Sequence, residues 1–205
     1  MRDVDGRSEL AGTEGRDVDG RSELARTEGR NTPSLASYIR SIPDFPKPGI
    51  VFRDITPLLA DPQGLDASLS ALTALTSELT PDIVIGAEAR GFLFGPALAH
   101  RLGAGFALAR KPGALPHKTI REEYALEYGT AVLELHEDAI CPGARVLVHD
   151  DLLATGGTAR ALCSLAEQLG GVVVGCAFLI ELAFLPGREA LAPHDVHALI
   201  RYDEK

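Results

Sequence analysis

The chain has 205 residues, of which 45% are hydrophobic and 24% are charged, enough to bury one core of ordinary size. Its 20 basic and 29 acidic side chains give a formal net charge of −9, which argues against a nucleic acid or an acidic membrane as partner. The composition indicates a soluble globular protein in which an anionic ligand must be held by local positive charge or by a metal ion.

Cysteine content and hydropathy indicate where the protein works. Cys141, Cys163 and Cys176 have neither the even number nor the close spacing of a disulfide framework or a zinc site, so we expect buried free thiols in a reducing cytoplasm. The longest strongly apolar run, at 172–180, is far shorter than the roughly 20 residues of a membrane-spanning helix. The charged N-terminus lacks the apolar segment of a secretory signal, and a cytoplasmic protein is expected.

The N-terminal segment contains a direct repeat. RDVDGRSELAGTEG at 2–15 recurs at 16–29 with Arg26 in place of Gly12. So charged a segment, without aromatic residues, cannot bury enough surface to offset its loss of conformational entropy. We expect a disordered tail at 1–32 and one folded domain at 33–205, with a partner-binding tail as the alternative.

The folded domain begins with a predicted helix over 33–42, followed by the proline-rich turn PDFPKPG at 43–49. Leucines at helical spacing predict a helix over 64–79, which ends before a proline. An apolar strand is predicted next, at 83–88, and then a helix that is closed by Gly103.

The alternation of strands and helices continues to the end of the chain. Strands are predicted at 105–110, 145–150, 172–181 and 197–202, a helix at 158–170, and an intervening polar segment at 118–136. Continuous apolar strands separated by helices predict an α/β fold, with a parallel sheet covered on both faces.

The stretch VLVHDDLLATGGT at 146–158 joins a predicted strand to a predicted helix and carries the main functional signal. In parallel α/β sheets, ligands bind beyond the carboxyl ends of the strands. The turn would place backbone amides, hydroxyls and a helix N-terminus around a phosphate. Its residues are Ala154, Thr155, Gly156, Gly157 and Thr158.

Two acids precede this turn, and His149 before them is interpreted either as a packing residue or as a residue that supports the site from behind the acids. Asp150 and Asp151 are placed to accept hydrogen bonds from vicinal hydroxyls, so the stretch fits a ribose 5-phosphate. The sequences GxGxxG and GxxxxGK[ST] are absent, which argues against a dinucleotide or nucleoside-triphosphatase site. A capped helix after a solvated acidic turn is the alternative.

Four stretches make the chain resemble the type I phosphoribosyltransferases, and in particular those that use adenine. They are DFPKPGIVFRDITPLL at 44–59, EARGFLFGPALA at 88–99, YALEYGTAVLELH at 124–136 and VHDDLLATGGTA at 148–159. The resemblance implies a Rossmann-like parallel sheet, a small hood formed by the N-terminal region, and a mobile hairpin loop. It also implies magnesium-dependent transfer of a phosphoribosyl group from phosphoribosyl pyrophosphate to N9 of adenine, giving AMP and pyrophosphate.

The resemblance places the purine in the hood. Phe52 would stack on the base, while backbone groups of Val51 and Arg53 pair with its edge and favour a 6-amino over a 6-oxo group. Without the family, Phe52 is typical of an ordinary core aromatic.

The resemblance assigns the pyrophosphate to Arg90, Arg110 and Lys111, which supply positive charge. The guanidinium fork of Arg90 is suited to phosphate oxygens. The resemblance also leads us to expect a non-proline cis peptide between Glu88 and Ala89.

Catalysis would fall to Glu127 and Tyr128 in the mobile loop, together with Arg90. A carboxylate at Glu127 would manage the proton of the base and stabilise positive charge in the transition state. On spacing alone, Glu127 is typical of a solvated hairpin carboxylate.

One position departs from the family. RKPGALP at 110–116 has Ala114 where the family usually has a lysine that contributes to the pyrophosphate site. Lys118, Arg121 or magnesium carried by the donor would compensate for the missing charge.

Three broader expectations follow from the resemblance. The partners are adenine and phosphoribosyl pyrophosphate, and a homodimer is expected, as in many relatives. A transferase for another purine and a non-catalytic ligand-sensing regulator are the rival functions.

Overall fold

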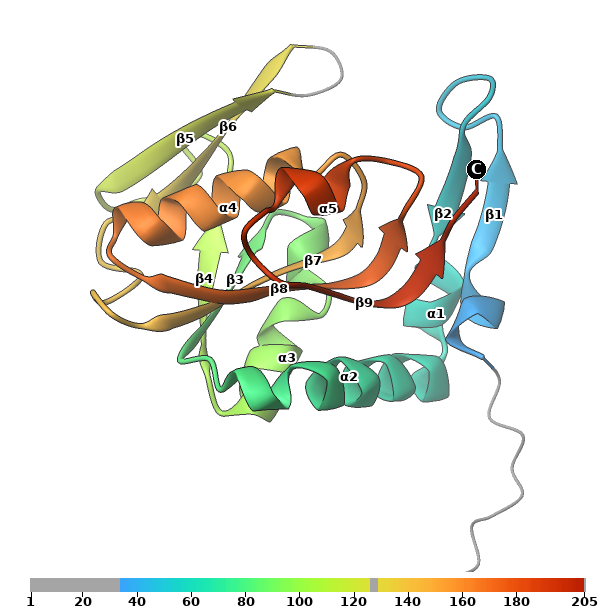
Figure 1. Ribbon diagram of the computed structural model, residues 1–205, viewed down its shortest axis with the longest axis horizontal. Coiled ribbons are helices and arrows are strands. Elements are labelled where there is room, and N and C mark those ends of the chain that lie inside the picture. The colour runs from blue at the N-terminus through green and yellow to red at the C-terminus, as the bar shows by residue number, and fades with distance from the viewer. Residues whose placement is uncertain (1–33, 126–128, 205) are drawn as a thin grey trace, which may run out of the picture. The chain divides into compact units, whose positions relative to one another are not determined.

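A five-stranded parallel sheet runs through the computed structural model, which describes residues 34–125 and 129–204 (Figure 1). The strand order is β4-β3-β7-β8-β9, and every pairing is parallel, as predicted for an α/β fold. The strands are β3 (Ile83–Ala87), β4 (Gly105–Ala109), β7 (Arg145–Leu153), β8 (Val172–Leu182) and β9 (Val196–Tyr202). The repeat, the rest of the expected tail at 1–32, and the loop residues Glu127 and Tyr128 lie outside the described residues.

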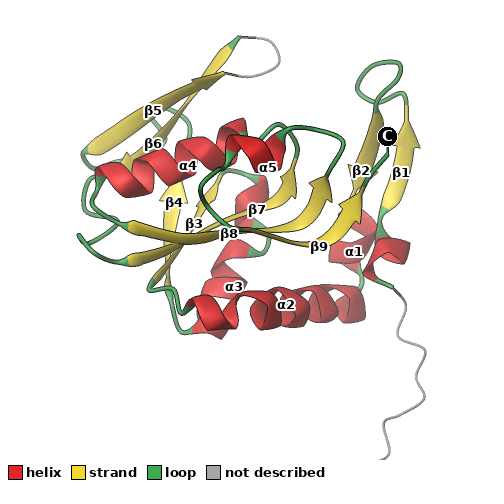
Figure 2. Ribbon diagram, in the orientation of Figure 1, coloured by secondary structure: helices red, strands yellow, loops and turns green. Residues whose placement is uncertain are grey.

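Helices cover both faces of this sheet (Figure 2). One face carries α2 (Pro62–Thr76) and α3 (Gly95–Leu102), and the other carries α4 (Gly157–Gln168) and α5 (Gly187–Ala190); α1 (Thr56–Ala60) precedes α2. As predicted, α3 ends at Gly103, whose φ of 69° suits a residue without a side chain.

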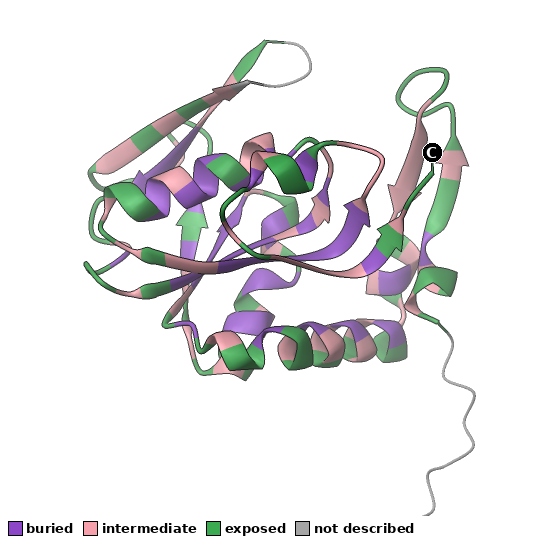
Figure 3. Cartoon of the chain, viewed as in Figure 1, coloured by how far each residue is buried: buried purple, intermediate pink, exposed green. Residues whose placement is uncertain are grey.

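The two faces have separate hydrophobic cores, because successive side chains of a strand point to opposite sides. Val146 and Val148 of β7 pack with Leu162 of α4, whereas Leu147 packs with Leu72 of α2. The central strands are buried on both sides, which explains why they read as continuous apolar runs (Figure 3).

Two antiparallel hairpins lie outside the central sheet. The first pairs β1 (Arg40–Pro43) with β2 (Val51–Asp54), and the second pairs β5 (Thr119–Ala125) with β6 (Thr130–His136). The first corresponds to the expected hood, and the second is formed by the polar segment at 118–136.

The predicted first helix over 33–42 is wrong. Only a short 3-10 helix, Leu35–Tyr38, forms, and the following residues pair with β2 instead. The β-branched Ile42 and the proline after it favour an extended chain. The Asp44 carboxylate accepts the amide of Gly49 at 2.8 Å and closes the proline-rich turn, which brings the two strands together.

The expectation of three buried thiols is correct for only two cysteines. Cys163 and Cys176 are buried with their sulfur atoms 3.7 Å apart, but Cys141 is exposed in the turn that precedes β7. The expectation for Cys141 rested on the apolar character of a free thiol, which does not indicate that the residue lies in an exposed turn. Among the described residues, no helix is long and apolar enough to cross a membrane.

His149 lies in the core of β7, as its interpretation as a packing residue requires. The side chain is fully buried, its ring meets Phe94 edge-on, and its Nδ1 lies 3.0 Å from the carbonyl oxygen of Ala177. Its Nε2 has no hydrogen-bond partner within the described part of the chain. Burial lowers the pKa of His149 to about 4, because the charged imidazolium is poorly solvated there.

We predict that His149 makes the fold sensitive to acid. Its folded-state pKa lies below the unfolded value of 6.5, so the unfolded state binds the proton more readily. Stability associated with this residue is complete above pH 6.5 and declines by up to about 3 kcal/mol as the pH falls towards 4. Urea unfolding between pH 7.5 and 4.5 should show a shallower decline for His149→Leu than for the wild type.

His100→Leu, at an exposed position, is the matched control and should follow the wild-type profile. Parallel pH profiles for His149→Leu and the wild type would show that His149 does not cause the decline.

Candidate functional site

The turn between β7 and α4 forms a small cavity at the carboxyl end of the sheet. A cavity of about 90 Å³ is lined by Asp150 and by residues 152–159. Helix α4 begins at Gly157, so its first amides have no partner within the helix and face this turn. Amides at a helix N-terminus are suited to bind phosphate, so the geometry of this turn is compatible with the predicted phosphate site.

Gly156 allows the chain to make this turn. Its φ of 85° lies in the left-handed region, and a Cβ atom there would stand 2.8 Å from the carbonyl oxygen of Gly187 and 3.0 Å from the Cβ of Ala190. Helix α5 therefore backs the turn closely. A side chain at this position would be strained by both the backbone and its neighbours.

The two acids lie within β7, which runs to Leu153 and so extends beyond the predicted end at residue 150. Their side chains alternate: Asp150 lines the cavity, whereas the side chain of Asp151 is 2% exposed and points to Arg90. The amide of Asp151 donates to Oδ1 of Asp150 at 2.9 Å.

Burial raises the pKa of Asp150, and the neighbouring charge of Asp151 raises it further. Burial also raises the pKa of Asp151, against the lowering effect of the Arg90 guanidinium. Two carboxylates this close do not ionise independently, and Arg90 favours the charged form at Asp151. Asp150, which lines the cavity, is therefore the weaker acid of the two.

Arg90 connects three parts of the site. Its Nε and Nη2 atoms lie 2.7 and 2.5 Å from Oδ2 of Asp151, and its guanidinium carbon lies 5.8 Å from the ring centroid of Phe52. It begins the 3-10 helix η3 (Arg90–Phe92) after β3. The peptide between Glu88 and Ala89 is cis, as expected.

A larger cavity of about 330 Å³ adjoins the turn. Its polar lining residues are Glu88, Arg90, Lys111, Tyr124, Asp150, Asp151 and Thr158. Asp150 and Thr158 also line the smaller cavity, so the two spaces meet at these residues. The arrangement offers amides at one end and cations at the other, with carboxylates between them.

The cations expected near the pyrophosphate differ in their placement. Lys111 lines the larger cavity, but Arg110 forms two 2.9 Å contacts with Glu88 and donates to the carbonyl oxygen of Ala114 at 3.1 Å. The amide of Lys111 also bonds Glu88 at 2.6 Å, and this bond is the main reason for the lowered pKa of Glu88. Arg110 thus fixes the 110–114 segment.

The two candidates for compensating the missing lysine at Ala114 are engaged elsewhere. Lys118 lies 3.7 Å from Glu137, and Arg121 lies 3.5 Å from Glu134. Glu134 is 5% exposed and accepts the amide of Gly113 at 3.0 Å.

The three hood residues point in two directions. Phe52 faces Arg90 and meets Phe45 edge-on at 5.2 Å, whereas Val51 lines a separate, mainly apolar cavity of about 260 Å³ together with Ala154. Arg53 bonds the Ser41 hydroxyl at 2.5 Å and stacks 3.9 Å above the ring of Tyr202.

Sequence reasoning missed Glu88 and Tyr124 as site residues. Tyr124 stands in the quoted YALEYG stretch, and alternation along β5 would have placed it with Ile120 on the face that packs against the core. The bonds from Glu88 to the 110–114 segment join residues far apart in the chain and left no local signal.

A family model described as a phosphoribosyl transferase domain matches residues 58–197, which include the acid pair, the phosphate-sized turn and Arg90. The chain belongs to this phosphoribosyltransferase family. It is 62% identical over 167 residues to the adenine phosphoribosyltransferase of Rubrobacter xylanophilus, covering 81% of this chain and 90% of the relative. It is 55% identical to that of Solibacter usitatus, covering 84% and 99%.

Solved structures of this family share the fold. The adenine phosphoribosyltransferase of Thermoanaerobacter pseudethanolicus superposes with a TM-score of 0.80 at 50% identity, covering 82% of this chain and 98% of that one. The enzyme of Rhodothermus marinus superposes with a TM-score of 0.77 at 53% identity, covering 82% and 96%.

We predict that Gly156→Ala lowers both stability and affinity for phosphorylated ligands. The left-handed φ costs an alanine roughly 1 kcal/mol, and the close carbonyl oxygen adds a further penalty. Gly143→Ala is the matched control, because Gly143 has a similar φ of 82° but no atom of the described residues within 4 Å of the added Cβ. Thermal unfolding with and without ribose 5-phosphate should show the larger loss for Gly156→Ala. Equal losses in the two variants would refute the role assigned to α5 behind the turn.

Proposed function

We propose that this protein is an adenine phosphoribosyltransferase. It transfers the 5-phosphoribosyl group of phosphoribosyl pyrophosphate to N9 of adenine and releases pyrophosphate. The observation that carries the proposal is the meeting of the acid pair, the phosphate-sized turn and the Arg90 and Lys111 cavity at the end of β7. The high identity to adenine phosphoribosyltransferases supports the choice of base.

The two cavities suggest how the donor lies. Its 5-phosphate occupies the turn of Ala154, Thr155, Gly156, Gly157 and Thr158, where the amides and hydroxyls gather. The ribose hydroxyls donate to Asp150, which lines both cavities, while Asp151 acts by holding Arg90. The pyrophosphate lies towards Arg90 and Lys111, and Arg110 supports this end through Glu88.

The base lies in the hood between β2 and the end of β7. Phe52 offers an aromatic face beside Arg90, and Val51 borders an apolar cavity that reaches Ala154. Val51 and Arg53, two residues apart on β2, direct their backbone groups to the same strand edge, as pairing with one purine edge requires.

The reaction exchanges one bond at C1 of the ribose for another. The bond from C1 to the pyrophosphate oxygen breaks, N9 of adenine bonds C1 from the opposite face, and the base loses a proton. Glu127 receives that proton and, with Tyr128 in the same loop, stabilises the cationic transition state. Arg90 neutralises the charge that develops on the departing pyrophosphate.

Magnesium is the proposed cofactor and enters with the donor. No direct protein ligand is assigned to the ion, which would be held by the phosphate and ribose oxygens of the donor. When bound, it would neutralise pyrophosphate charge, and this need is greater here because Ala114 replaces a lysine.

A homodimer and a cytoplasmic location complete the proposal. Leu93, directly after η3, is 43% exposed, and Leu108, on the edge strand β4, is 45% exposed. A second subunit would cover both side chains. Two free thiols 3.7 Å apart suit a reducing compartment.

An assay with phosphoribosyl pyrophosphate and magnesium tests the function directly. Adenine, hypoxanthine, guanine and xanthine are offered separately, and AMP from adenine should be the main product. Glu127→Ala should reduce kcat by about 10²- to 10⁴-fold, the usual contribution of a positioned general base. Nucleotides formed mainly from a 6-oxopurine would replace this proposal with a related transferase, and no product with intact donor binding would favour a ligand-sensing protein.

Ala114→Lys should strengthen donor binding. A lysine here would return a positive charge to the 110–114 segment, which Arg110 and Glu134 already hold in place. We expect the KM for the donor to fall about two- to fivefold, which corresponds to a favourable interaction of about 0.5–1 kcal/mol between partly exposed charges. Ala74→Lys, at an exposed position of α2, introduces the same charge away from the site and should leave the KM unchanged. An unchanged KM in Ala114→Lys would count against the charge deficit.

A further inference from the structure

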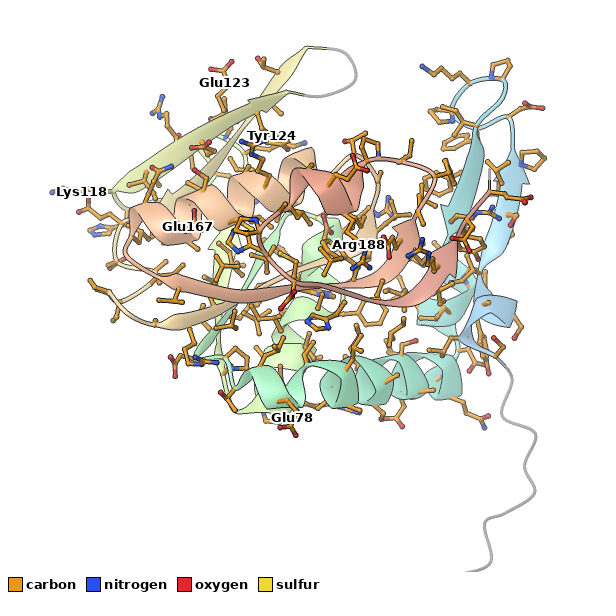
Figure 4. All side chains as sticks on the ribbon, viewed as in Figure 1. Glu78, Lys118, Glu123, Tyr124, Glu167 and Arg188 are labelled. Carbon is orange, nitrogen blue, oxygen red and sulfur yellow. The ribbon has the colours of Figure 1, made fainter. Side chains whose placement is uncertain are left out.

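Tyr124 joins the β5–β6 hairpin to the phosphate-sized turn. Its hydroxyl oxygen lies 3.5 Å from Oγ1 of Thr158, in the first turn of α4. Figure 4 shows Tyr124 between the hairpin and α4, whereas Glu123 points to the other side of the hairpin. The family resemblance implies roles for Glu127 and Tyr128, which follow in the chain, but none for Tyr124.

The position of the Tyr124 hydroxyl is fixed by packing. Its ring is half-buried against the core beneath α4, as is Ile120 on the same face of β5. A tyrosine held in this way has few conformations open to it, and its polar tip remains at a defined place. Tyr124 lines the larger cavity and also a neighbouring space that is lined by Thr155 and Gly157.

The hydrogen-bond chemistry of Thr158 gives Tyr124 a role when phosphate is bound. A threonine hydroxyl has one proton, and a phosphate dianion in the turn would take it in a charge-assisted hydrogen bond. The lone pairs of the Thr158 oxygen are then available only to accept. The Tyr124 hydroxyl stands at the outer limit of hydrogen-bond distance, so a small approach lets it donate to Thr158.

We propose that Tyr124 is a positioning residue for the 5-phosphate and acts through Thr158. Its phenol donates to the Thr158 oxygen, which orients the Thr158 proton towards the phosphate and polarises that bond. This inference rests on the proposed function for the identity of the ligand, but it depends only on the phosphate. Tyr124 therefore contributes to the binding of phosphorylated ligands and not to that of the base.

The test compares the binding of AMP and adenosine to the wild type and to Tyr124→Phe by isothermal titration calorimetry. The two ligands differ only in the phosphate, so a loss confined to AMP isolates the proposed effect. We expect AMP to bind about three- to tenfold more weakly to the variant, as for the loss of one hydrogen bond, and adenosine to bind equally well. In steady-state assays, the KM for the donor should rise by a similar factor while kcat changes less than twofold.

Two further variants sharpen the comparison. Tyr38→Phe removes a tyrosine hydroxyl from the 3-10 helix Leu35–Tyr38, which lies in a different part of the fold, and should change neither affinity. In a Thr158→Val background, Tyr124→Phe should have no further effect on AMP, because the residue through which it acts is gone.

The outcomes separate this inference from the proposed function. If Tyr124→Phe weakens AMP and adenosine equally, the residue acts by packing alone and the inference is wrong; it is also wrong if neither affinity changes. If the wild type binds AMP no better than adenosine, the turn does not hold a phosphate and both proposals fall. A wild type that prefers AMP but does not form it from adenine contradicts only the proposed function, since the binding data still decide the role of Tyr124.

Discussion

The ion pair between Arg90 and Asp151 is the contact on which the arrangement of this site depends. The carboxylate is almost fully buried, and a buried charge without a partner is strongly destabilising, so Arg90 is tied to the end of β7. Arg90 begins η3 directly after β3, and the pair therefore joins the ends of two neighbouring strands. The guanidinium also approaches Phe52, so this hood residue lies at the same edge of the sheet.

The same contact gives the neighbouring acids different properties. Asp151 satisfies its charge within the protein, whereas Asp150 projects into the space where the two cavities meet. Alternation along a strand is enough to separate them, since adjacent side chains point to opposite faces. Both acids line the larger cavity, but only Asp151 is held by Arg90, and only Asp150 also lines the smaller cavity.

Two carboxylates near the site hold the 110–114 segment in place. Glu88 binds both the Arg110 side chain and the Lys111 amide, and Glu134 binds the amide of Gly113. These carboxylates hold the segment that carries Lys111 to the cavity. In a protein with a net charge of −9, this ordering places the local positive charge of Lys111 beside the cavity.

The sequence predicted the parts of the molecule that depend on local pattern. The parallel sheet follows from continuous apolar runs, and the phosphate-sized turn follows from two glycines at a helix N-terminus. The local pattern at 33–42 predicts a helix, but residues 40–43 pair with β2. That pairing depends on the turn at 43–49 and cannot be seen in the pattern of 33–42 alone.

Long-range contacts were not predictable in the same way. Arg110 fixes the 110–114 segment, whereas Lys111 lines the cavity. This difference depends on Glu88 and Glu134, which contact the segment from distant parts of the sequence. Tyr124 was overlooked for a similar reason, because its meaning depends on the packing of β5 against α4. The expected roles of Glu127 and Tyr128 rest on the family resemblance, since these residues lie outside the described part of the chain.

The most direct test of the central role of the ion pair is a double-mutant cycle on the free energy of unfolding, using Arg90→Gln, Asp151→Asn and the double variant. If the pair holds the strand ends together, each single variant will be less stable than the wild type. The double variant will then be more stable than the sum of the two losses predicts, by more than about 0.5 kcal/mol. Losses that add within that margin would show that Arg90 and Asp151 act independently, and would contradict the account.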